Sequence, residues 1–177
     1  MRARTNRPGT RLPATVTAAR MVVERRVFAG CLPIAGMARL RPSLADDGGE
    51  ACFELEFGQG ELGDRELRVR VKAAVNLQCQ RTLETFEHQV EVDTRLGLID
   101  NEQQEAGLPE DVEPLLLDDG LLRPAAVIED ELLLALPLVP VKPGSRLPEF
   151  ESGEAAADAA DEKENPFAVL GRLKQNK

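Results

Sequence analysis

The feature that most constrains the fold is an alternation of apolar and mostly polar residues that runs for thirteen positions, from residue 67 to residue 79. Every odd-numbered position in this stretch is apolar, beginning with Leu67 and ending with Cys79. A period of two places these side chains on one face of an extended strand and leaves the other face for charged and amide groups. The segment therefore predicts a strand with one buried face.

The same pattern occurs on both sides of this segment. Residues 51–57 alternate before it, and residues 86–96 alternate after it, with Val90, Val92 and Leu96 in phase. Three consecutive half-buried strands joined by short connections predict an antiparallel meander.

A change of period marks residues 123–136. Pro124 suits the first turn of a helix, Pro137 and Pro140 end it, and the apolar residues between them recur at helical spacing. The segment predicts an amphipathic helix laid on the apolar face of the sheet, which gives an α+β fold. A weaker pattern at residues 14–26 predicts a short second helix, and residues 100–119 form an acidic connection that we expect to be partly mobile.

Charge is segregated along the chain, although the total is only −9. Residues 1–26 hold seven arginines and one acid, whereas residues 27–165 hold 12 basic and 30 acidic residues. An acidic body repels phosphate, so any direct contact with nucleic acid falls to the two ends of the chain. Trp and Tyr are absent, which removes the usual platform for stacking bases.

These shifts in composition predict four regions. Residues 1–11 form a basic, disordered arm, residues 12–148 a single domain, residues 149–164 an acidic solvated linker, and residues 165–177 a C-terminal motif.

The motif combines an apolar segment with basic residues, which is typical of a docking element. Its other possible use is to fold back onto its own domain, and the sequence leaves both open. The expected partner-binding residues of the motif are Asn165, Pro166, Phe167, Val169 and Leu170, with Arg172 and Lys174 as a basic rim.

Three cysteines are too few and too unevenly spaced for a disulfide framework. Cys31, Cys52 and Cys79 are therefore expected to be small buried apolar groups in a reducing compartment. No run of about 18 apolar residues occurs, and the first 20 residues lack the apolar core of a secretory signal. These features favour a cytoplasmic protein.

No coherent catalytic, cofactor or metal site is expected. Residues 58–63 match the glycine spacing of a dinucleotide-binding loop, but they lead into a strand, so a glycine-rich turn is favoured. His88 is the only histidine and could approach Cys79 across a hairpin. Those two residues lack the further ligands that zinc needs and the third group that orients a catalytic base, so a half-buried histidine is favoured.

Three consecutive acids, Glu129, Asp130 and Glu131, lie on the predicted helix. Successive helical side chains diverge by about 100°, so these carboxylates do not converge as a catalytic pair. They predict an exposed acidic face, on which Glu129 and Asp130 could contact a basic partner.

Three segments point together to one known family: residues 77–81 with Phe86 and His88, residues 127–140, and residues 165–170. They resemble the bacterial YceD family, the large ribosomal RNA subunit accumulation proteins, and the resemblance extends from about residue 12 to the end of the chain. It implies a role in synthesis, processing or stability of 23S ribosomal RNA, with no catalytic activity assigned.

Two positions depart from the family pattern. Many members carry a second cysteine three residues after the first, in a pair suited to zinc, but this chain has Thr82 there and no cysteine after Cys79. A zinc-dependent version of the family therefore cannot operate here. The residue before the helix, often an aspartate suited to capping, is Arg123.

The expected function is that of a noncatalytic factor in large ribosomal subunit biogenesis. Its expected partners are proteins, either basic ribosomal proteins or ribosomal RNA maturation factors, because an acidic body complements them. The alternative is direct binding of ribosomal RNA through the N-terminal arginines. An enzyme built on Cys79 and His88 ranks last.

Overall fold

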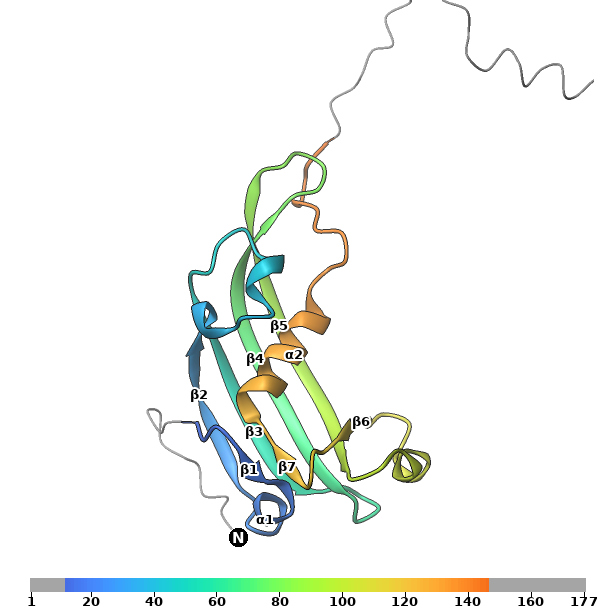
Figure 1. Cartoon of the computed structure of the whole chain (residues 1–177). Helices are drawn as coiled ribbons and strands as arrows, with labels where there is room; N and C mark the ends of the chain where they lie inside the picture. Colours follow the sequence, from blue (N-terminus) through green and yellow to red (C-terminus); the bar gives the residue numbers. More distant parts are fainter. Residues whose placement is uncertain (1–11, 147–177) are drawn as a thin grey trace, which may run out of the picture. The chain divides into compact units, whose positions relative to one another are not determined.

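A five-stranded, mostly antiparallel sheet forms the body of the protein (Figure 1). The structure is a computed structural model, and it describes residues 12–146. The strands lie in sequence order, with antiparallel neighbours except for the parallel last pair. They are β2 (Val27–Pro33), β3 (Glu50–Gln59), β4 (Arg65–Gln78), β5 (Thr85–Ile99) and β6 (Glu113–Leu116).

Shorter elements complete the fold. The strands β1 (Val16–Thr17) and β7 (Leu121–Leu122) pair in a separate two-stranded sheet. Within residues 12–146, the α-helices are α1 (Ala18–Val23) and α2 (Pro124–Ala135), and the 3₁₀ turns are η1 (Ile34–Gly36), η2 (Arg41–Ser43) and η3 (Glu102–Gly107).

The α+β class, the meander β3–β4–β5 and the helix α2 confirm the sequence predictions. Two predictions need correction. The N-terminal helix spans only Ala18–Val23, because β1 occupies the residues before it. The acidic connection contains η3 and the edge strand β6, in which Pro114 is accommodated at the edge of the sheet. The N-terminal arm, the acidic linker and the C-terminal motif lie outside the described residues and stay predictions.

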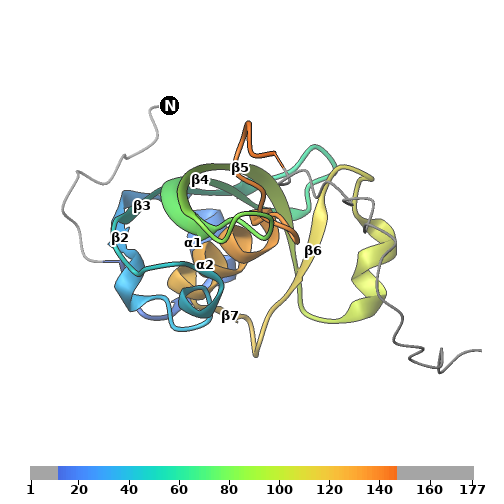
Figure 2. The ribbon, with the colours of Figure 1, turned by 90° about the horizontal axis from the view of Figure 1, so that it is seen from above.

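The core lies on one face of the sheet, as the alternation requires. In the register of the strands Phe53 lies opposite Val71, which lies opposite Val92. Helix α2 packs over β4 and β5, and the curved sheet wraps around it (Figure 2). The helix contributes Val127, Ile128 and Leu132 to the core, and the loop after β2 contributes Ile34, Met37 and Leu40.

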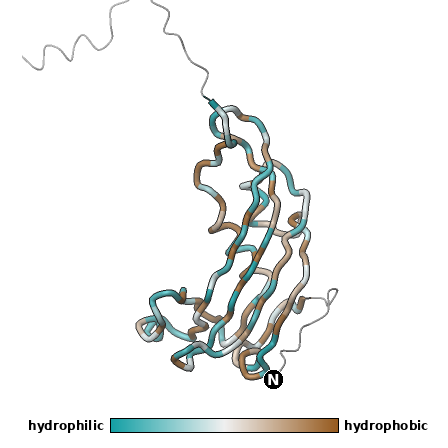
Figure 3. Tube along the Cα trace, turned by 180° about the vertical axis from the view of Figure 1, so that it is seen from behind, coloured by the Kyte–Doolittle hydropathy of each residue, from teal (hydrophilic) through white to brown (hydrophobic). Residues whose placement is uncertain are grey.

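The opposite face of the sheet is polar, and its charges are paired across the strands. Figure 3, seen from behind, shows hydrophilic and hydrophobic residues alternating along the strands. Arg68 contacts Asp93 at 2.8 Å, and Lys72 forms an ion pair with Glu91. Exposed pairs of this kind contribute about 0–1 kcal/mol each, so they make the face polar more than they stabilise it.

A disulfide joins Cys31 of β2 to Cys52 of β3. The two residues lie directly opposite each other in the strand register, with Cα atoms 4.0 Å apart, and both side chains are exposed. The prediction that they are buried apolar groups is therefore wrong. The pairing follows from the register of β2, a strand that the sequence pattern did not predict. Cys79 is free and buried, as expected.

Among residues 12–146, no helix is long and apolar enough to cross a membrane.

We predict that Gly97→Ala destabilises the fold. A Cβ at residue 97 would lie 2.6 Å from the Leu108 side chain and 3.1 Å from that of Val112. Overpacking of this kind costs about 1–3 kcal/mol in the free energy of unfolding, measurable by urea denaturation. Gly58→Ala in β3 is the matched control, because a Cβ there meets nothing within 4 Å. Equal stability of the two variants would contradict the packing of residues 108–112 against β5.

Candidate docking groove

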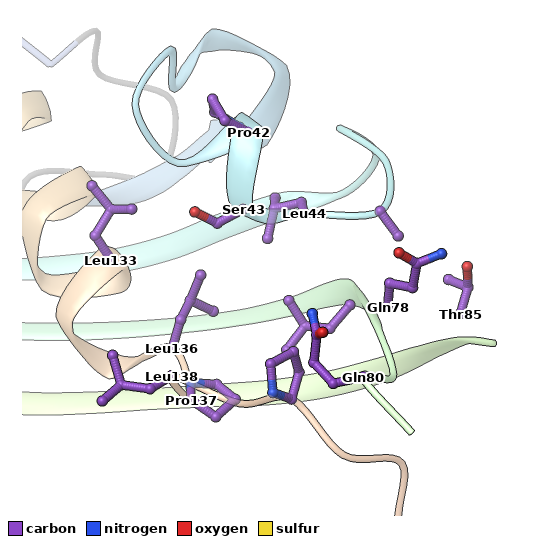
Figure 4. Close-up of a pocket in the computed structure, with 13 residues that line it drawn as sticks. Pro42, Ser43, Leu44, Gln78, Gln80, Thr85, Leu133, Leu136, Pro137 and Leu138 are labelled. Atoms are coloured by element: carbon purple, nitrogen blue, oxygen red, sulfur yellow. The ribbon is translucent and has the colours of Figure 1, made fainter. Parts of the chain in front are cut away.

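A groove of about 640 Å³ lies at the end of the sheet where β4 and β5 meet (Figure 4). Three separate segments form its walls: the loop at η2, the ends of β4 and β5, and the C-terminal end of α2 with the residues after it. The lining residues are Pro42, Ser43, Leu44, Ala45, Leu77, Gln78, Gln80, Thr85, Leu133, Leu136, Pro137, Leu138 and Pro140.

The groove exists because β4 is longer than β3. The last pair between these two strands joins Ala51 to Ala73, so the final residues of β4 extend past β3. There the loop before β3 takes over, and the Ala45 N–H donates to the Asn76 carbonyl at 2.7 Å. A loop covers less of the apolar face than a strand would, which leaves the groove open.

The third wall is apolar and extends beyond the groove. Helix α2 ends because Pro137 cannot continue it, and the chain becomes extended at Leu136. Exposed apolar side chains follow on this segment, including Leu138, which is fully exposed. Val139 and Val141 are also exposed on it, and Leu134 is exposed in the last turn of α2. A cluster of exposed apolar residues beside a groove is typical of a binding surface.

Cys79 lies at the tip of the β4–β5 hairpin, where hydrogen bonds join the hairpin to the segment after α2. Its sulfur accepts a hydrogen bond from the Lys142 backbone N–H at 3.3 Å, and the Ser145 hydroxyl lies 4.0 Å away. Nearby, the Gln80 N–H donates to the Pro140 carbonyl at 2.9 Å, and Arg81 donates to the Ser145 carbonyl at 2.6 Å. These contacts tie the tip of the β4–β5 hairpin to the segment after α2.

The environment of Cys79 favours a thiolate. The Thr82 hydroxyl and then the Lys142 backbone N–H lower the pKa of the Cys79 thiol to about 6. The neighbouring residues do not fit zinc, because only Cys79 offers a thiolate and the others are a threonine, a lysine and a serine. Within residues 12–146, no three His, Cys, Asp or Glu side chains are grouped for a metal ion.

Sequence reasoning missed Lys142 and Ser145, because they lie more than sixty residues from Cys79. The prolines at 137, 140 and 143 were the available signal of an extended segment there.

The hypothesis that His88 approaches Cys79 is wrong. His88 lies opposite Val75 in the strand register, and its ring makes an edge-to-face contact with Phe86. The prediction that His88 is half-buried is confirmed.

The acidic residues of α2 are used inside the domain. The Glu129 carboxylate accepts hydrogen bonds from the backbone N–H groups of Arg39 and Leu40, at 2.6 and 3.1 Å. The Arg39 guanidinium also donates to the Asp130 carboxylate at 2.5 Å and to the Ala126 carbonyl at 3.2 Å. Together these contacts hold the loop before η2 against the helix, and so position one wall of the groove.

The expectation of an exposed acidic face is wrong for Glu131. This side chain is buried, and burial raises the pKa of its carboxyl, although a hydrogen bond with Thr94 acts in the opposite direction. Asp130 is half exposed, and Glu129 is largely covered. The remaining expected partner-binding residues, at 165–174, lie outside the described part of the chain.

The described residues thus define a small α+β domain that presents, at one end of its sheet, a groove with one apolar wall. Residues 67–174 match the family model of the large ribosomal RNA subunit accumulation protein YceD. Over 170 residues the chain is 31% identical to the Haemophilus influenzae protein of that name, and the alignment covers 93% of this chain and 97% of the relative. The chain therefore belongs to the YceD family. No solved structure is significantly similar to it.

We predict a pH-dependent contribution of Cys79 to stability. The pKa of its thiol is about 6 in the folded state and about 9 in the unfolded chain, so between these values the unfolded chain binds more protons. The free energy of unfolding should rise between pH 6 and 9 and lose this contribution as the pH falls through 6.

The comparison is with Cys79→Ser, measured by urea denaturation in a Cys31→Ser, Cys52→Ser background that leaves no other thiol. The stability difference between parent and variant should grow from pH 6 to 9. A constant difference would show that the sulfur is not held as a thiolate.

A second prediction separates Glu129 from Asp130. Glu129→Ala should lower the free energy of unfolding by about 1–3 kcal/mol, because two backbone N–H groups lose their acceptor and Leu40 is buried. Asp130→Ala, which removes an exposed ion pair, should cost no more than about 1 kcal/mol. A larger loss for Asp130→Ala than for Glu129→Ala would refute this assignment.

Proposed function

We propose that the protein is a noncatalytic bacterial factor acting in synthesis, processing or stability of 23S ribosomal RNA, and that it works by binding protein partners. Family membership supports the ribosomal RNA role, because the matching relative is named for large ribosomal RNA subunit accumulation. The observation that carries the binding role is the groove, with the fully exposed Leu138 at its rim.

Electrostatics favour a protein partner over RNA for the described domain. Residues 12–146 carry 14 basic and 24 acidic side chains, a net charge of −10. The basic residues on the outer face of the sheet are paired with acids, as Arg70 is with Glu54 and Glu56. Such a surface repels phosphate and attracts the basic proteins that are abundant in ribosome assembly. Direct RNA contact is left to the arginines of residues 1–11, which lie outside the described domain.

We assign two elements to partner binding. The first is the groove, in which an apolar side chain of a partner would be desolvated among Leu133, Leu136 and Leu138. The second is the C-terminal motif, with Phe167 and Leu170 as its main apolar anchors. The family match spans residues 67–174, and therefore includes the motif as far as Lys174 and the groove walls formed by β4, β5 and the end of α2 with the residues after it. On α2, Asp130 is the more accessible acid for a basic partner, because it is half exposed and its bond to Arg39 uses one carboxylate oxygen, whereas Glu129 is largely covered and also holds the Arg39 and Leu40 N–H groups.

The proposed role is tested by replacing the protein in the bacterium that encodes it. Depletion should lower the ratio of 23S to 16S ribosomal RNA, and re-expression of the wild-type chain should restore it. Leu138→Asp should fail to restore the ratio. Burying a leucine contributes about 1.5–3 kcal/mol, so losing it weakens partner binding about tenfold or more.

The matched control is Leu62→Asp. Leu62 is also exposed, but it lies in the β3–β4 turn, away from the groove residues. Both variants should accumulate to wild-type levels by immunoblot. An unchanged ratio on depletion would exclude the ribosomal RNA role, whereas full rescue by Leu138→Asp would exclude the groove and leave the RNA role standing.

A further inference from the structure

Strand β5 has a free edge along most of its length. It pairs with β4 from Thr85 to Gly97, but β6 pairs only with the stretch from Leu96 to Ile99. Within the described chain no strand lies beside the other edge of residues 85–95. About ten residues of a fully formed strand are therefore available to another extended chain.

The hydrogen bonds of neighbouring elements reveal which backbone groups face this edge. The Asn76 carbonyl accepts from Ala45, on the side away from β5. Because both backbone groups of a residue in an antiparallel strand point to the same side, Asn76 and its register partner Glu87 form a non-hydrogen-bonded pair. The N–H and C=O of Glu87 therefore point to the free edge.

The alternation extends this assignment along β5 to Gln89, Glu91 and Asp93. An independent contact also places the backbone groups of odd-numbered β5 residues on the side away from β4. The carbonyl of Ile99, another odd-numbered residue, accepts from the Leu117 N–H on the β6 side.

The side chains along the edge define what can pair with it. The edge-facing residues Glu87, Gln89, Glu91 and Asp93 place acids or an amide on the polar face of the sheet. Among the described residues, Glu91 and Asp93 form their ion pairs with cations of β4. On the opposite face Phe86, Val90 and Val92 are buried or half-buried. An added strand would place one set of side chains beside carboxylates and the alternate set beside apolar groups.

We propose that the free edge of β5, residues 85–94, binds an extended segment of a protein partner in which lysine or arginine alternates with apolar residues. The segment adds a strand to the sheet, on the same edge of β5 with which β6 pairs further along. A second copy of this chain fits the edge poorly, because pairing two such edges would set acids opposite acids. The biological identity of the partner rests on the proposed function, but the test below does not.

The test uses a fluorescein-labelled ten-residue peptide of alternating lysine and valine, blocked at both ends, with binding to the full chain measured by fluorescence polarisation. Gln89→Pro should weaken binding by at least about tenfold, because it removes an edge-facing N–H and obstructs the approach of a strand. Gln89→Ala keeps the N–H and should bind within about twofold of wild type.

Thermal unfolding, monitored by circular dichroism, checks that each variant is folded. Gln89→Pro removes no hydrogen bond to β4, so its Tm should stay close to that of Gln89→Ala, whereas Val90→Pro should be strongly destabilised. The same peptide N-methylated at every residue should not bind, because neither of its edges can then donate a backbone hydrogen bond to β5.

Three results would overturn the proposal: no binding of the peptide, equal binding by Gln89→Pro and Gln89→Ala, or unchanged binding after N-methylation. A wild-type dimer that becomes monomeric in Gln89→Pro, seen by light scattering, would assign the edge to a second copy instead. None of these results bears on the ratio of 23S to 16S ribosomal RNA, so failure of this inference is distinguishable from failure of the proposed function.

Discussion

The structure depends on two strands that are longer than the strands beside them. β4 and β5 are 14 and 15 residues long, whereas β3 has 10 and β6 has 4. Their shared apolar face drives the packing of α2 and the loop after β2, because an apolar strand face must be removed from water. The excess length has two consequences. On one side it leaves a groove covered by loops, and on the other it leaves a strand edge without a neighbour within the described chain.

Loops that close such a sheet end need contacts other than a strand ladder. Here the buried sulfur of Cys79 accepts a hydrogen bond that ties the hairpin tip to the segment after α2, while Glu129 holds the loop carrying Arg39. The Lys142 backbone N–H donates to this single sulfur, and the Gln80 N–H and the Arg81 side chain donate to carbonyls of the same segment. Hydrogen bonds and the Lys142–Glu84 ion pair thus hold these two segments together.

The sequence predicts those strands and helices in which one face is buried, because their apolar residues recur at a regular spacing. The alternation from Leu67 to Cys79 and the helical spacing around Ile128 were sufficient for β4 and α2, because burial on one side imposes a period. The strand β2 was missed because its residues do not alternate, and its disulfide was missed with it. The buried state of Glu131 and the approach of Lys142 to Cys79 depend on contacts between distant segments. The family resemblance, by contrast, rested on local motifs and is confirmed by the comparisons.

Amide hydrogen exchange measured by NMR tests, residue by residue, whether β5 keeps an open edge. The amides of Glu87, Gln89, Glu91 and Asp93 should exchange rapidly, whereas those of Phe86, His88, Val90 and Val92 should be protected by their bonds to β4. Adding the lysine–valine peptide should slow exchange of the first set alone. Protection of both sets in the free protein, or the opposite parity, would contradict an open edge on β5.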